Sequence, residues 1–177
     1  MGEQEFDLKR AWPARRAVAL GGGTKTELRG RMGRAGVALN GYAEELFASG
    51  LFVVSEKRYS LDIVEASVEG LGFPQGAVMG EILARAGGLG LGLCPLELGP
   101  WLRLEYLDQP EGNAGRPARP GQAPLGAITI VSAALVEDDG FPKGFYLRRI
   151  DGVLWLRGYR SGPAHIWSPD DRLIFTA

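Results

Sequence analysis

Cysteine and histidine are almost absent from this sequence of 177 residues, which has one of each, Cys94 and His165. A single cysteine rules out an internal disulfide, and such sparing use of thiols is typical of proteins in reducing compartments. One histidine and one cysteine also fall short of the nitrogen and sulfur ligands of a usual zinc site. We therefore expect no disulfide and no metal. No cofactor-binding signature occurs either, so we expect no cofactor.

Long hydrophobic runs are missing as well. A membrane-spanning helix requires about 18 consecutive apolar residues, and no such stretch occurs. The first residues, MGEQEFDLKR, contain no apolar segment of the kind that a signal peptide needs. The sequence therefore predicts a cytoplasmic protein with no membrane association.

The chain has no strong excess of charge of either sign, since its formal net charge is −1. The charges are unevenly distributed: residues 1–34 have net +4, residues 35–142 net −8 and residues 143–177 net +3. Basic ends can form a nucleic-acid surface, but a dedicated nucleic-acid binder usually has a clearly basic domain. We favour ends that fold back on the acidic middle, and we keep a nucleic-acid-associated protein as a further alternative.

The clearest structural signal that is present is the segment 144–160, GFYLRRIDGVLWLRGYR. Asp151-Gly152 between two strand-like runs predicts a two-residue hairpin turn, which fixes the register so that Tyr146 lies opposite Arg157. Alternation along the strands then predicts an apolar face toward the core and an arginine–aromatic face opposite. The apolar face consists of Phe145, Leu147, Leu154 and Leu156 with Arg149, and the arginine–aromatic face of Tyr146, Arg148, Ile150, Val153, Trp155 and Arg157.

Before the hairpin, the apolar spacing predicts mainly helices. Residues 1–23 are expected to be a flexible arm and residues 24–177 a single α+β domain. A helical stripe runs from Leu28 to Leu46, but its glycines leave one helix and two helices broken near Gly36–Asn40 equally open. The other expected elements are a short strand at 51–54, a helix at 61–71 with a strand over 61–64 as the alternative, and a helix from Val78 to Ala86.

The second half is predicted to be mainly sheet. Strands are expected at 101–107, 127–135 and 172–176 in addition to the hairpin, with a long Pro/Gly-rich loop at 108–126. The predicted fold class is therefore α+β, with N-terminal helices packed on a twisted, mainly antiparallel sheet.

Three segments of this half, LCPLELGPWLRLEYLDQPEG, GFYLRRIDGVLWLRGYR and WSPDDRLIF, together resemble a family of uncharacterised bacterial proteins. The resemblance extends over most of the chain after residue 27. It implies no activity, cofactor or catalytic residue, so a function has to be argued from the residues themselves.

The best candidate for a binding site is the arginine–aromatic face of the hairpin. Tyr146, Arg148, Trp155 and Arg157 form a compact group across two strands, and arginine stacked on aromatic rings binds anions, bases or partner proteins. The alternative is that a helix or the 108–126 loop covers this face, with its arginines paired to the acidic middle of the chain.

Glu97 is a further candidate, because a carboxylate set among leucines and prolines needs a partner. Either it belongs to a functional loop, or it forms a salt bridge with Arg103 or with an arginine of the hairpin. We favour the salt bridge.

Catalysis would depend on Cys94 and His165, the minimum set for a cysteine-dependent hydrolase or transferase, with Glu97 or Asp170 to orient the histidine. Cys94 lies between a leucine and a proline, which is typical of a buried structural cysteine. The sequence therefore favours a non-catalytic binding or interaction protein with an unknown small-molecule or protein partner. The small enzyme is the alternative.

Overall fold

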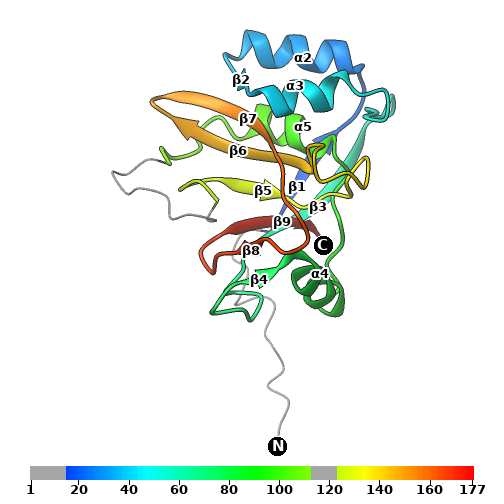
Figure 1. Cartoon of the computed structure of the whole chain (residues 1–177). Helices are drawn as coiled ribbons and strands as arrows, with labels where there is room; N and C mark the ends of the chain where they lie inside the picture. Colours follow the sequence, from blue (N-terminus) through cyan, green and yellow to red (C-terminus); the bar gives the residue numbers. More distant parts are fainter. Residues whose placement is uncertain (1–14, 113–122) are drawn as a thin grey trace, which may run out of the picture.

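A mixed sheet of seven strands runs through the centre of the protein (Figure 1). The computed structural model describes residues 15–112 and 123–177. The pairs β2–β7 and β5–β9 are parallel and the other pairs are antiparallel, which confirms the predicted α+β class with a mainly antiparallel sheet. Across the sheet the strands are β1 (Arg15–Leu20), β3 (Tyr59–Ser67), β9 (Arg172–Thr176), β5 (Ile128–Ile130), β6 (Gly144–Ile150), β7 (Val153–Tyr159) and β2 (Ala38–Leu39).

Helices pack on both faces of this sheet; of those in the described residues, three contribute to the larger hydrophobic cluster on one face and a fourth to the smaller cluster on the other. Figure 1 shows their arrangement around the sheet. A small two-stranded sheet lies beside the fourth helix. No helix in the described residues is both long enough and apolar enough to cross a membrane. The three helices are α2 (Lys25–Arg34), α3 (Gly41–Ala48) and α5 (Leu98–Glu105), the fourth is α4 (Met79–Gly88), and the small sheet consists of β4 (Ala77–Val78) and β8 (Ile166–Trp167).

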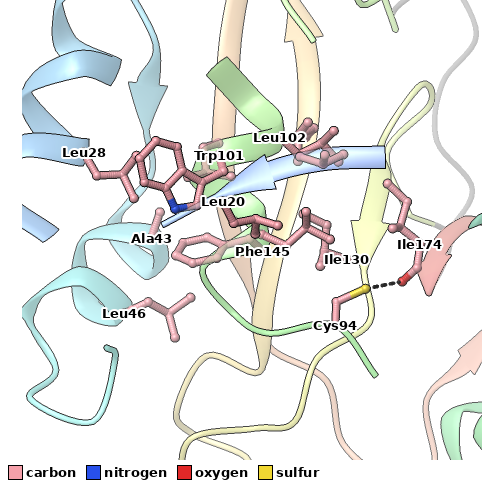
Figure 2. Packing of buried hydrophobic residues seen from close by; sticks show 14 of the residues in the cluster. Leu20, Leu28, Ala43, Leu46, Cys94, Trp101, Leu102, Ile130, Phe145 and Ile174 are labelled. Carbon is pink, nitrogen blue, oxygen red and sulfur yellow. Dashed lines mark hydrogen bonds between the residues drawn. The ribbon is translucent and has the colours of Figure 1, made fainter. Parts of the chain in front are cut away.

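The central strands are buried on both faces, and their residues alternate between two hydrophobic clusters. On β9, Ile174 belongs to the larger cluster beneath α2, α3 and α5, whereas Leu173 and Phe175 belong to the smaller cluster with α4. On β3, Ile63 and Val64 divide in the same way. Figure 2 shows part of the larger cluster, with residues of the helices and of several strands converging on one another.

The hairpin forms as predicted. β6 and β7 pair in the expected register, and Asp151 and Gly152 have φ of 50° and 78°, the positive values that the tight turn needs. The carboxylate of Glu111 accepts hydrogen bonds from both turn amides, at 2.6 and 3.0 Å. Leu154 is only half-buried, because the end of the hairpin extends beyond the core that covers the other apolar residues of its face.

The strand predicted at 101–107 is wrong, because this segment is helix α5. Leu98, Trp101 and Leu102 are spaced three and four residues apart and are all buried, so one helical face supplies the apolar contacts. Pro100 lies in the first turn, where the backbone amides have no partner within the helix and proline is tolerated. The sequence LRLEY at 102–106 alternates between apolar and charged residues, a pattern that is also typical of a strand.

The helix predicted at 61–71 is also wrong, and the strand alternative is confirmed by β3. A strand buried on both faces contains apolar residues without strict alternation, and their spacing here imitated a helical stripe. Residues 15–20 form β1 rather than part of a flexible arm, and residues 1–14 of that arm lie outside the described part of the chain. Residues 51–54 form no strand, and the strand predicted at 127–135 is limited to β5.

The two-helix alternative for the first helical stripe is confirmed by α2 and α3. Thr24 and Glu27 form a capping box at the start of α2, with hydrogen bonds of 3.1 and 2.8 Å. Gly36, with φ of 71°, lies just after the end of α2, and Asn40 caps α3. The helix predicted from Val78 to Ala86 is present as α4.

Both ends of the predicted 108–126 loop are fixed to the sheet. The buried Gln109 donates hydrogen bonds from Nε2 to the carbonyl oxygens of Gly126 and Leu147, at 3.0 and 3.2 Å. Gly112 lies so close to Gly126 that a Cβ on Gly126 would be 2.4 Å from the Gly112 Cα. Residues 113–122, the interior of this loop, lie outside the described residues.

We expect Leu156→Ala to lower the free energy of unfolding by about 2–5 kcal/mol, because the Leu156 side chain is fully buried in the larger cluster. Val153→Ala is the matched control: Val153 lies on the same strand but is 40% exposed, so the expected change is about 0.5 kcal/mol or less. Urea denaturation of both variants measures the difference. Equal losses would show that β7 does not face the core as described.

Candidate ligand-binding site

A row of polar side chains crosses three neighbouring strands on the face of the sheet opposite α3 and α5. Thr129 on β5 pairs with Tyr146 on β6, which in turn pairs with Arg157 on β7. Tyr159 follows Arg157 by two residues and therefore lies on the same face. The hairpin register thus places a guanidinium, a phenol and a hydroxyl side by side.

This row forms one wall of a cavity of about 280 Å³, which we call the hairpin cavity. The other walls come from the start of α3, which follows the edge strand β2 next to β7, from residues just before β5 and from the segment that contains β8. No aspartate or glutamate lines it among the described residues, whereas two arginines and a histidine do. The lining residues are Asn40, Tyr42, Ala123, Pro124, Thr129, Tyr146, Arg157, Gly158, Tyr159, Arg160, Ser161, His165 and Trp167.

Arg157 is held in place by neutral groups. Its Nε donates a hydrogen bond to the Tyr146 hydroxyl at 2.8 Å, and its guanidinium lies 5.0 Å from the centre of the Trp155 ring. Neither contact neutralises the charge, so the remaining guanidinium donors are available to an anion. The second arginine, Arg160, differs, because it forms an ion pair of 3.4 Å with Glu45. Arg157 is therefore the main source of positive charge in the cavity.

The far corner of the cavity is aromatic. Trp167 packs edge-to-face against His165 on one side and Tyr159 on the other, with ring centroids 5.2 and 5.7 Å apart. The Trp167 indole nitrogen is buried and has no hydrogen-bond partner in residues 15–112 and 123–177. A buried donor without an acceptor costs free energy, so this corner of the fold carries an unsatisfied polar group next to the aromatic rings.

Two polar residues give the walls a fixed shape. Asn40 caps α3 and also bonds β7: its Oδ1 accepts from the Gly158 amide at 2.8 Å and its Nδ2 donates to the Gly158 carbonyl at 3.0 Å. The buried Asp171 accepts hydrogen bonds from the amides of Ser168 and Ala123, at 2.8 and 3.2 Å. Burial raises the pKa of the Asp171 carboxyl group, and the two amides partly oppose that effect. Gly158, which bonds Asn40, and Ala123, which bonds Asp171, both line the cavity.

The structure brings together only part of the predicted site. Tyr146 and Arg157 line the hairpin cavity together with His165, which the sequence suggested only as a catalytic residue. Arg148 and Trp155 lie on the same face but closer to the turn, outside the cavity lining. The buried Nε of Arg148 has no hydrogen-bond partner in the described part of the chain. The arginine–aromatic face of the hairpin is therefore partly buried: Tyr146 is buried, whereas Arg148, Trp155 and Arg157 are half-buried.

Sequence reasoning missed several residues of the cavity. Tyr159 could have been found, because it continues the alternation of the hairpin by two residues beyond Arg157. Asn40 and Trp167 come from segments far from the hairpin in sequence, and no local pattern indicates that they meet it. Their contribution depends on how α3 and β8 pack against the sheet.

Glu97 lies elsewhere, on the side of the sheet covered by α5. Its carboxylate accepts hydrogen bonds from the Tyr59 hydroxyl at 2.8 Å, the Trp101 indole at 3.1 Å and the Ser55 amide at 3.2 Å. Burial, followed by the hydrogen bond to Glu97, raises the pKa of Tyr59. The predicted salt bridge from Glu97 to Arg103 or to a hairpin arginine is therefore replaced by neutral donors.

Arg103 is fully buried and has a different set of partners. Its guanidinium donates to the Gln109 side chain at 2.5 Å and to the carbonyls of Tyr106 and Trp155. Burial lowers the pKa of Arg103 to about 10, so it stays protonated near neutral pH. Arg103 thus fixes the end of α5 to β7 and has no part in the hairpin cavity.

Cys94 is a buried residue of the larger hydrophobic cluster. Its thiol donates to the Ile174 carbonyl at 3.5 Å (Figure 2). Burial raises the pKa of this thiol to about 12, so it is almost entirely un-ionised near neutral pH. His165 contacts Trp167 instead and lies in the hairpin cavity. The two side chains of the predicted catalytic pair therefore contact different groups.

Comparison with protein-family models, with curated proteins and with solved structures gives no match. The resemblance to a bacterial family, stated from the sequence, therefore stays a prediction. Among the residues that the structure describes, no group of three or more histidine, cysteine, aspartate or glutamate side chains is arranged to hold a metal ion.

We expect Glu97→Gln to lower the free energy of unfolding by about 1–3 kcal/mol, because the neutral amide replaces hydrogen bonds to a charged carboxylate with weaker neutral ones. Glu105→Gln, at an exposed position of the same helix, is the control and should change stability by about 0.5 kcal/mol or less. Urea denaturation compares them. An unchanged free energy of unfolding in Glu97→Gln would mean that the negative charge of Glu97 adds little to these hydrogen bonds.

The raised pKa of Cys94 gives a second expectation, about stability at alkaline pH. Above about pH 9 the thiol ionises in the unfolded chain but stays protonated in the folded protein. Its contribution to stability is therefore complete below pH 9 and is lost as the pH rises toward 12. Between pH 9 and 11, Cys94→Ala should lose less stability than the unmodified protein in urea denaturation. Fast alkylation of the folded protein by iodoacetamide near neutral pH would contradict this account and favour the enzyme alternative.

Proposed function

We propose that this chain is a non-catalytic binding protein whose hairpin cavity binds a small anion with a flat or apolar part. The observation that carries the proposal is Arg157, a half-buried guanidinium whose partners among residues 15–112 and 123–177 are a phenol and an indole ring. A partly desolvated arginine without a carboxylate partner gains from an anionic ligand, because a hydrogen bond between two charged groups is stronger than one between neutral groups.

The aromatic corner supports the same class of ligand. Tyr159 and Trp167 offer apolar ring surface beside the guanidinium. A volume of about 280 Å³ is near the lower end for small-molecule sites, so the part of the ligand held here is small. We place this binding function in the cytoplasm, because the chain has a single, unpaired cysteine.

Other functions have weaker support. The cysteine-dependent enzyme needs a thiolate, and burial of Cys94 opposes its formation. A nucleic-acid surface needs a run of exposed cations. Several arginines outside the cavity are instead paired with carboxylates, such as Arg15 with Asp62 and Arg172 with Glu65. A protein partner on the open part of the hairpin face remains the alternative within the binding class.

Benzoate and benzamide test the proposed function directly, because they are similar in shape and differ in charge. Isothermal titration calorimetry should show that benzoate binds roughly tenfold or more tightly than benzamide, the difference expected for a hydrogen bond to a charged group. Arg157→Gln should abolish this difference. Arg15→Gln, on the edge strand β1, is the matched control and should leave it unchanged.

Equal binding of the two compounds by the unmodified protein would overturn the proposal, as would an unchanged preference in Arg157→Gln. Circular dichroism of each variant verifies that the fold is retained. Rapid hydrolysis of an ester or thioester that is lost in Cys94→Ala would favour the enzyme instead.

A further inference from the structure

A second and larger cavity lies next to the hairpin cavity. It has a volume of about 490 Å³ and lies between α4, the segment after β5 and the segment after β7, and we call it the α4 cavity. Its lining includes apolar side chains from three parts of the chain: Met79 and Leu83 of α4, Leu93, and Val131 with Ala133 and Ala134. Leu93 is 46% exposed, although large aliphatic side chains are usually buried.

Three charged residues line the α4 cavity, Glu137, Asp139 and Lys143, and its single cation is paired. Lys143 forms an ion pair of 3.1 Å with Asp139 and donates to the Asp138 carbonyl at 3.1 Å. The lysine is therefore neutralised, unlike Arg157 in the hairpin cavity. The α4 cavity offers mainly apolar contact and no free cation among its described residues, so it suits a hydrocarbon group rather than a second anion.

Tyr159 and Ser161 line both cavities. Both spaces therefore border one short segment at the end of β7 and just beyond it. Arg157 precedes Tyr159 by two residues on the same strand, which separates them by about 7 Å along the sheet. A ligand whose anionic group contacts Arg157 must reach past Tyr159 before any part of it enters the α4 cavity.

We propose that the two cavities together bind one amphipathic ligand, a carboxylate with an unbranched alkyl chain. The carboxylate binds Arg157 in the hairpin cavity, and the chain passes Tyr159 and Ser161 into the α4 cavity. This inference rests on the proposed function and adds the class of ligand. The Tyr159 ring lines both cavities and gives the alkyl chain an apolar surface to pass.

The test uses sodium butanoate, octanoate and decanoate, each below the concentration at which it forms micelles, in isothermal titration calorimetry with the full chain. Butanoate is too short to pass Tyr159 and should bind weakly. Octanoate and decanoate should bind at least roughly tenfold more tightly, because their additional methylene groups leave water for the α4 cavity.

Two variants fill the α4 cavity without changing the hairpin cavity. Ala134→Trp replaces an exposed residue, so it leaves the core intact, and Leu83→Trp fills the cavity from α4. Both should remove most of the advantage of octanoate over butanoate while the dissociation constant for butanoate stays the same. Val53→Trp is the control, because Val53 is exposed and lies outside both cavities.

The outcomes separate this inference from the proposed function. If benzoate and butanoate bind through Arg157 but affinity does not rise with chain length, the amphipathic ligand is wrong and the anion site stands. If affinity rises with chain length as much in Ala134→Trp and Leu83→Trp as in the unmodified protein, the alkyl chain lies outside the α4 cavity and the inference is overturned. If no anion binds, or if Arg157→Gln binds all three carboxylates as before, the proposed function fails as well.

Discussion

The pairing of Tyr146 with Arg157 across β6 and β7 is the contact on which the arrangement of the candidate site depends. A turn of exactly two residues, with positive φ at both, sets this pairing. A shift of one residue would exchange the faces, placing Arg157 in the hydrophobic cluster beneath α3 and α5 and Leu156 in the cavity. The cost of burying an unpaired guanidinium makes that alternative register unfavourable. The same turn therefore specifies the core on one face and the charge on the other.

Gly158 shows how closely the two faces are linked. It lies between Arg157 and Tyr159 and points to the core side, where a Cβ would come within 2.6 Å of the Tyr42 backbone. The lack of a side chain lets the start of α3 pack directly on β7, and Asn40 joins the two by hydrogen bonds to the Gly158 amide and carbonyl. The wall of the hairpin cavity is therefore formed by elements with little freedom to move apart, which favours a preformed site.

The sequence was sufficient for features that depend on local chemistry and insufficient for those that depend on packing. The hairpin, its register and the burial of Cys94 follow from residues close together in the chain. Strand β3 was misassigned because a strand buried on both faces has apolar residues at spacings that also fit a helix. Helix α5 was misassigned because its short sequence alternates between apolar and polar residues as a strand does. Only some of the residues that line the cavity with Arg157 could be predicted from the sequence. Tyr146 is its neighbour in the hairpin, but Trp167 reaches the site through β8.

The two buried charges of α5 show why a salt bridge between them was a reasonable expectation and why the fold does not need it. Glu97 stands at the start of α5 and Arg103 in its last turn. The helix dipole favours a negative group at the first end and a positive group at the second, so each charge is already in a favourable field. Neutral donors then satisfy Glu97, and the Gln109 side chain and backbone carbonyls satisfy most of Arg103. Because Glu97 is held by its neutral donors on the side of the sheet that α5 covers, this carboxylate is not available to neutralise Arg157, and the hairpin cavity retains its positive charge.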